Sequence, residues 1–198
     1  MKVDVRTLEG EPMTAKAAVQ PVGSGLRIAP AFAATATDQS RSIETRIEAR
    51  YIAAEGRYVT TAVSVRASDD TTEINANALR QVTVQAIVQE AAPHCIALTL
   101  SDNPNAEWLT VAELSTQDGR LIPDWLAADV VKRGPNGARM DVIEIVYGAA
   151  ALAGTPPVRA IVRELNVSHR TASDWTAKAR AAGRLEGMSY AVGRQADG

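Results

Sequence analysis

Residues 155–183 read TPPVRAIVRELNVSHRTASDWTAKARAAG, and this stretch decides how the C-terminal third of the chain folds. The hydroxyl of Thr155 is the predicted N-cap of a first helix, placed just before two prolines that fit a helix start. Asn166 tolerates the left-handed backbone of a tight turn, and Ser168 is a suitable N-cap for the helix that follows. We therefore expect a helix up to Asn166, a short turn, and a second helix over residues 168–182.

Apolar residues in both helices recur at spacings of three and four, as on the buried face of an amphipathic helix. The expected buried positions are Val158, Ile161, Val162 and Leu165 in the first helix and Ala172, Trp175 and Ala179 in the second. A third helix is predicted just upstream, over residues 140–153, with Gly154 as its stop. Its apolar stripe consists of Met140, Ile143, Val146, Tyr147 and Ala150. The three helices can share one small core.

The segment from Ile161 to Trp175 resembles the helix-turn-helix family of DNA-binding modules, and the resemblance covers about residues 141–185. In that pattern Val167 fills the corner between the helices and Ala172 leaves room for their close crossing. The sequence departs from the pattern at Val162, where the family usually has alanine, and at Asn166, where it usually has glycine.

The resemblance implies that helix 168–182 enters the major groove of DNA and that its N-terminal residues reach base edges. The implied base contacts are Ser168, His169, Arg170, Thr171, Ser173 and Asp174. Arg170 is the best candidate for a bidentate contact with guanine, whereas Asp174 suits a cytosine amino group or holds Arg170 in place. Contacts with phosphates position such a domain without reading sequence. The implied phosphate contacts are Thr155, Arg159, Arg163, Lys178, Arg180 and Arg184.

Charge is distributed unevenly along the chain. Residues 155–185 contain six basic and two acidic residues, a net +4, although the whole chain of 198 residues carries −2. A basic segment on an acidic body is expected when one part of a protein meets an anionic polymer.

The N-terminal part has a strand-like pattern. Residues 43–51 and 58–67 alternate apolar and polar side chains across a turn, which predicts a β-hairpin. A helix is expected over residues 79–92, stopped by Pro93, with a strand after it. The predicted fold is therefore α+β, with a β-hairpin-containing domain over residues 1–134 and a three-helix domain over residues 138–185. Residues 186–198 are expected to form either a loose tail or a short wing.

Several classes of function find no support in the composition. One cysteine and two histidines cannot supply the four close-spaced ligands of a typical zinc site, so we expect no metal, no cofactor and no enzymatic activity. Cys95 is expected to be a small core residue. The single cysteine, the lack of an apolar signal segment and the lack of a long apolar run all favour a cytoplasmic protein.

The leading hypothesis is a transcriptional regulator that binds double-stranded DNA as a homodimer, with its N-terminal domain sensing an effector or binding a protein partner. One alternative is an accessory protein of DNA processing or of a mobile element that uses the same module, and the location of its bound sites would distinguish it. A second alternative is a protein-interaction adaptor that ignores DNA. A steep salt dependence of DNA binding would argue against that adaptor.

Overall fold

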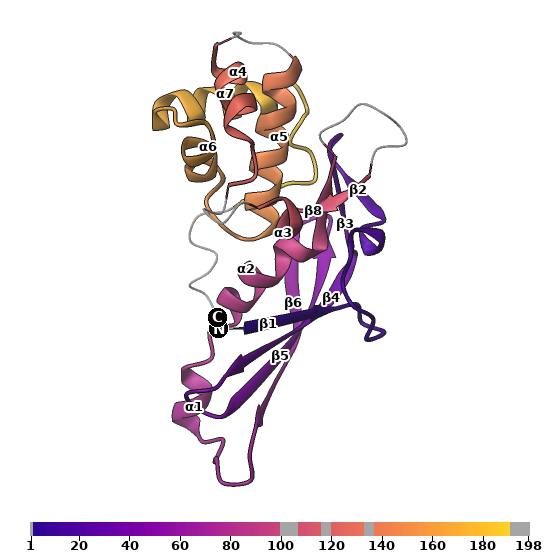
Figure 1. The fold of residues 1–198 in the computed structure, drawn as a ribbon, viewed down its shortest axis with the longest axis vertical. Helices are drawn as coiled ribbons and strands as arrows, with labels where there is room; N and C mark the ends of the chain where they lie inside the picture. Colours follow the sequence, from indigo (N-terminus) through magenta and orange to yellow (C-terminus); the bar gives the residue numbers. More distant parts are fainter. Residues whose placement is uncertain (1, 100–106, 116–119, 133–136, 191–198) are drawn as a thin grey trace.

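The computed structural model describes residues 2–99, 107–115, 120–132 and 137–190, and it shows an α+β protein. Strands dominate the N-terminal part and helices the C-terminal part, as the sequence predicts. The described strands form two antiparallel sheets of four strands each. In Figure 1 the helices of the C-terminal third gather at one end of the molecule, beyond the sheets.

The first sheet has the strand order β1-β4-β5-β6. Its strands are β1 (Lys2–Arg6), β4 (Ala31–Asp38), β5 (Ile43–Ile52) and β6 (Arg57–Ala67). The predicted hairpin is confirmed as the antiparallel pair β5–β6. Alternate residues of β5, from Ile43 to Ala49, are buried, because one face of the sheet lies on the core and the other faces solvent.

The second sheet is small and has the order β2-β3-β7-β8. Its strands are β2 (Gln20–Val22), β3 (Leu26–Ile28), β7 (Ile96–Leu98) and β8 (Leu109–Thr110), and a short 3₁₀ helix, η1 (Ala15–Ala17), precedes it. The turn between β2 and β3 points toward the C-terminal helices, where it meets a glutamate described below.

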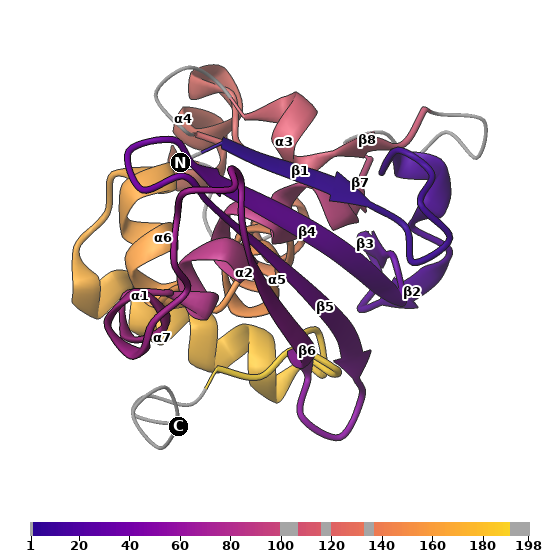
Figure 2. The same ribbon diagram turned by 90° about the horizontal axis from the view of Figure 1, so that it is seen from below.

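Two helices follow the first sheet, α1 (Ala76–Arg80) and α2 (Val84–Cys95). Helix α2 packs on the inner face of the sheet and contacts all four of its strands (Figure 2). The expectation that Pro93 stops this helix is wrong, because α2 continues to Cys95. Proline removes only one backbone hydrogen bond, and close to a helix end the packing of Ala91, Ala92 and Cys95 in the core outweighs that loss.

The remaining helices form the C-terminal end of the molecule. They are α3 (Val111–Leu114), α4 (Asp124–Lys132), α5 (Gly137–Leu152), α6 (Pro157–Leu165) and α7 (His169–Ala181). The three helices expected after residue 137 are present, and α5, α6 and α7 contact one another in pairs. Helix α4 joins this group through contacts with α5 and α6, although it precedes the predicted domain boundary. Residues 133–136, where that boundary falls, lie outside the described residues.

Helix α5 is buried far beyond the single stripe that its sequence predicts. Every residue from Val142 to Ala153 is buried. One side of α5 packs against α6 and α7, and another approaches β6 of the first sheet and the β2–β3 turn of the second. The C-terminal helices are therefore joined to the sheets through α5.

The segment after α7 packs on the β5–β6 turn. The hydroxyl of Tyr51 donates to the carbonyl oxygen of Gly187 at 2.7 Å, and the amide of Ser189 donates to that of Gly56 at 3.1 Å. Residues 186–190 contain no strand, and these two hydrogen bonds hold them on the β5–β6 turn. The remainder of that expected segment, residues 191–198, lies outside the described residues. Within the described ranges, no helix has the length and apolar character needed to cross a bilayer.

Candidate nucleic-acid interface

The turn between α6 and α7 has the backbone that its sequence predicts. Asn166 adopts the left-handed conformation, with φ 50° and ψ 45°, and ends α6. Ser168 is the N-cap of α7, and its hydroxyl accepts a hydrogen bond from the amide of Thr171 at 3.1 Å. These two residues fix where one helix ends and the next begins, and so they set the direction of α7.

The start of α6 differs from the prediction. The N-cap is Pro156 and not Thr155, and no side chain caps this end of the helix. The hydroxyl of Thr155 instead donates to the carbonyl oxygen of Ala150 at 3.2 Å. It therefore satisfies a carbonyl at the end of α5, where helices leave acceptors without intrahelical partners.

The core between the helices contains most of the residues expected from their spacing. Ile161, Leu165, Ala172 and Ala179 are buried, whereas Val158 and Val162 are half-buried and pack against the core. Trp175 is half-buried, and the guanidinium of Arg139 lies 4.2 Å from the centre of its ring. Arg139 is itself buried and donates to the carbonyl oxygen of Val130 at 2.8 and 3.0 Å, near the end of α4. A cation over an indole ring stabilises the pair and here links α4, α5 and α7.

The N-terminal turn of α7 is exposed to solvent. His169 and Arg170 are both exposed. The ring nitrogen Nδ1 of His169 lies 3.4 Å from the hydroxyl of Ser173, one turn further along the same helix. The side chain of Arg170 forms no hydrogen bond or ion pair with any residue that the structure describes. Its guanidinium is therefore available to a ligand without first breaking an internal contact.

Asp174 does not hold Arg170 in place. Its carboxylate forms an ion pair with Lys178 at 2.8 Å, one turn along α7, and both side chains are more than half exposed. Such exposed pairs contribute little to stability and exchange readily for other partners. Thr171 and Ser173 are half-buried on the same helix.

The basic residues of α6 flank this face. Arg159 is exposed, and within the described parts of the chain it has no ion-pair partner. Arg163 is exposed for 61% of its side chain and lies 3.2 Å from Oε1 of the buried Glu164. Both guanidinium groups can reach a phosphate, because most of each side chain is in solvent.

The last two basic candidates make internal contacts. Arg180 donates to the hydroxyl of Tyr147 at 2.7 Å. Arg184 donates to the hydroxyl of Ser24 at 2.7 Å, lies 3.3 Å from the carboxylate of Glu144, and pairs with Asp141. Arg184 thus connects the end of the helical region to the β2–β3 turn, and its guanidinium is already engaged by these internal partners.

Two buried glutamates were not expected from the sequence. The carboxylate of Glu164 in α6 accepts from the amides of Leu121 and Ile122 at 2.8 and 3.1 Å. The carboxylate of Glu144 in α5 accepts from the amides of Ser24 and Gly25, the second at 3.1 Å. Each glutamate therefore supplies an acceptor to two consecutive amides of a distant loop, which is how a buried carboxylate is usually compensated.

One signal for Glu144 is present in the sequence. It is the only charged residue in the otherwise apolar run from Val142 to Ala153, and a charge in such a run needs a partner. The partner itself has no local signal, because Ser24 is 120 residues away. Glu164 occupies a position three residues after Ile161, on the edge of the predicted apolar stripe.

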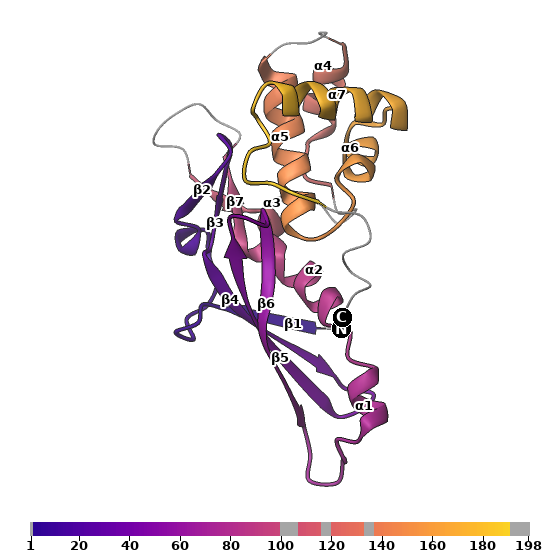
Figure 3. The ribbon, with the colours of Figure 1, turned by 180° about the vertical axis from the view of Figure 1, so that it is seen from behind.

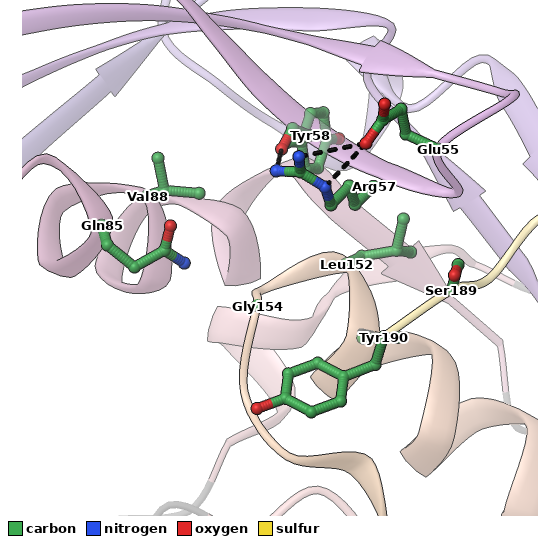
Figure 4. Close-up of a pocket in the computed structure, with 10 residues that line it drawn as sticks. Glu55, Arg57, Tyr58, Gln85, Val88, Leu152, Gly154, Ser189 and Tyr190 are labelled. Atoms are coloured by element: carbon green, nitrogen blue, oxygen red, sulfur yellow. Dashed lines mark hydrogen bonds and ion pairs between the residues drawn. The ribbon is translucent and has the colours of Figure 1, made fainter. Parts of the chain in front are cut away.

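Two cavities adjoin the helical region. The smaller, of about 40 Å³, lies between the β5–β6 turn, α2 and the segment after α7, where Arg57 pairs with Glu55 (Figure 4). Its volume is well below the about 300–1,000 Å³ that is usual for small-molecule sites. The larger, of about 360 Å³, has a mainly apolar lining from α2, α5 and α6, and Arg159 and Arg163 also line it.

Cys95 lies in the core, as expected, and burial raises the pKa of its thiol above the ordinary value. A thiol that stays protonated is a poor nucleophile and a poor metal ligand. Across residues 2–99, 107–115, 120–132 and 137–190, no group of three or more histidine, cysteine, aspartate or glutamate side chains is arranged to hold a metal ion.

Comparison with known proteins gives no relative. No protein-family model matches the chain, and searches of curated proteins and of solved structures found no match either.

Proposed function

We propose that this protein binds double-stranded DNA in a sequence-specific manner and acts as a transcriptional regulator in the cytoplasm, with α7 as the helix that enters the major groove. The observation that carries the proposal is Arg170. It stands in the first turn of α7, is exposed, and has no internal partner among the described residues, whereas Ser168 and Asn166 anchor the backbone on either side of the turn.

The surroundings of α7 support this role. The helix lies at the end of the molecule opposite α1, away from the bulk of the first sheet (Figure 3). A helix of 13 residues with one exposed face can lie in a groove about 12 Å wide. His169, Ser173 and Asp174 lie along the same exposed side and supply further donors and acceptors for base edges.

Phosphate contacts come from both helices. Arg159 and Arg163 on α6, and Lys178 on α7, hold exposed positive charge beside the proposed base-reading face. Lys178 exchanges Asp174 for a phosphate at little cost, because an exposed ion pair is weak. Arg180 keeps its hydrogen bond to Tyr147 and contributes charge near the end of α7.

The proposal is tested by selecting bound sequences from random duplex DNA, with wild type and Arg170→Ala in parallel. Wild type is expected to enrich a motif, and Arg170→Ala is expected to lose preference at one guanine position, with about 10- to 100-fold weaker binding to the selected site. Arg80→Ala is the matched control, because Arg80 is an exposed helical arginine at the other end of the molecule. It should leave both the motif and the affinity unchanged.

Salt dependence provides the second measurement. Binding through several phosphates predicts a steep fall in affinity between low and moderate salt, since each neutralised phosphate releases counterions. Enrichment of no motif by wild type at moderate salt, together with a flat salt dependence, would overturn the proposal and indicate that the helical face binds protein.

A further inference from the structure

Strand β6 is a long, open sheet edge. It has 11 residues and pairs with β5, and no other described strand lies against it. Residues 61–64 are all exposed. An edge strand presents a row of N–H and C=O groups that can template the pairing of another strand.

One of the usual protections of an edge, a β-bulge, lies in β6 at Thr61, but residues 62–67 follow it as a regular stretch. These six residues contain no proline, no lysine and no acidic residue, and Arg66 is their only charge. The opposite edge of the sheet is protected, because the chain folds back beside β1: the amide of Met13 donates to the carbonyl oxygen of Val5 at 3.1 Å, and Arg6 bridges to Pro12. The described sheet is thus closed on one side and open on the other.

The inner face of the sheet continues as an apolar row onto this edge. Val63 lies opposite Ile47, and Val65 lies opposite Thr45. Ile47 and Thr45 are buried beneath the helices, but Val63 is 47% exposed. The register of the β5–β6 pair shifts between Glu48 and Ala49, so residues 62–67 form a regular stretch beyond the irregularity.

We propose that β6 pairs with β6 of a second copy of this chain, antiparallel and about a two-fold axis centred on Ser64. In an antiparallel pair, directly opposed residues point to the same face. Centring on Ser64 therefore places Val63 against Val65 of the second copy, and Val65 against Val63, on the inner face. Arg66 then lies opposite Ala62, so no like charges are directly opposed. The result is a continuous eight-stranded sheet with a closed, isologous interface.

The two-fold axis of such a pair is perpendicular to the sheet, so the inner faces of both copies lie on the same side of it. Helix α2 and the helices joined to it through α5 then lie on the same side in both copies. This arrangement presents two copies of α7 with two-fold symmetry, as a palindromic site requires. The dimer itself needs no DNA, so the test of the dimer does not depend on the proposed function.

The first test is a disulfide at the axis. Ser64 is exposed, and across an antiparallel pair its Cα atom would lie about 4.5–5.5 Å from its counterpart, within the range that a disulfide spans. Ser64→Cys is expected to form a covalent dimer under mild oxidation, on non-reducing gels. The native Cys95 is buried and does not contribute. Ser40→Cys, at an exposed turn, is the matched control and should remain monomeric on these gels.

The second test is the mass in solution by light scattering. Wild type is expected at twice the chain mass of 21.0 kDa. Val63→Asp places a carboxylate in the apolar row of both copies and should raise the dimer dissociation constant by about 100-fold or more. Val19→Asp is the control, because Val19 is 66% exposed and lies outside β6. Circular dichroism verifies that each variant folds. A monomeric wild type, or a dimer that survives Val63→Asp while Ser64→Cys fails to cross-link, would overturn the proposal.

Discussion

Glu164 shows how one residue can fix the position of the helix that carries it. Its side chain is fully buried, and its carboxylate accepts from two consecutive amides just before α4. The guanidinium of Arg120 adds a third link by donating to the backbone oxygen of Glu164 at 2.6 Å. These contacts hold α6 against the chain that leads into α4. They therefore help to fix the position of α7, which packs on α6.

Replacement of Glu164 by alanine removes the acceptor from the amide of the buried Ile122 and from that of the half-buried Leu121. Because each such group costs about 1–3 kcal/mol, the free energy of unfolding should fall by about 2–5 kcal/mol in urea denaturation. Glu164→Gln should lose less, since the amide oxygen still accepts. Glu186→Ala, at an exposed position, should stay within about 0.5 kcal/mol of wild type. Equal stability of Glu164→Ala and wild type would contradict the role assigned to this carboxylate.

At the residue scale, the sequence predicts those features that depend on near neighbours. Ser168 as an N-cap and Asn166 in a left-handed turn follow from local chemistry, and both are confirmed. The partners of Glu144 and Arg184 could not be predicted, because Ser24 is supplied by a turn more than 100 residues away. Thr155 was misplaced by one position, since its hydroxyl has a competing acceptor in α5.

At the element scale, α6 and α7 act as one unit whose angle depends on a short turn. The left-handed residue lies at Asn166, and only glycine and a few short polar residues adopt that conformation readily. The orientation of α7, and with it the direction of Arg170, depends on this backbone.

Asn166→Gly and Asn166→Val form a matched pair that tests the turn. Glycine should keep the free energy of unfolding within about 0.5 kcal/mol of wild type, whereas valine, a β-branched residue with positive φ, should lower it by about 1–2 kcal/mol. Thermal and urea unfolding measure both variants. If valine were tolerated as well as glycine, the left-handed turn would not be required.

Periodicity predicts an element well only when the element has one buried face. The β5–β6 hairpin was predictable because β5 alternates buried and partly exposed residues. Helix α5 was found at nearly the expected place, but its burial on several sides was not, because a stripe predicts contact with one partner and α5 has several. The extension of α2 beyond Pro93 was missed because tertiary packing outweighs a local helix breaker.

At the scale of the whole molecule, α5 joins the two halves of the fold. It packs against α4, α6 and α7 and also contacts β6. Gly148, in the middle of α5, faces Leu26 of β3 and Met188 of the C-terminal segment so closely that a Cβ atom there would overlap both side chains. The sheets and the C-terminal helices can approach this closely because α5 has no side chain at Gly148.

Gly148→Ala should therefore destabilise the protein by about 1–3 kcal/mol through overpacking, despite the better helix propensity of alanine. Gly137→Ala, in the first position of the same helix and with no atom near the added Cβ, should be neutral or slightly stabilising. Met188→Ala makes room, so the double variant Gly148→Ala/Met188→Ala should lose less than the two single losses combined. Strict additivity in urea denaturation would show that Met188 does not limit the space.

The hydrogen bonds between Ser24 and Glu144 also affect the order in which parts of the fold form during synthesis. The β2–β3 turn leaves the ribosome early, but its carboxylate acceptor is 120 residues further along the chain. The strands of the first sheet all lie within residues 2–67, so this sheet can assemble while the rest of the chain is still being made. Contacts of long sequence separation form late, since a large loop must close first. In a nascent chain that ends before α5, the β2–β3 turn therefore has no carboxylate acceptor, and it gains Glu144 only when α5 has been made.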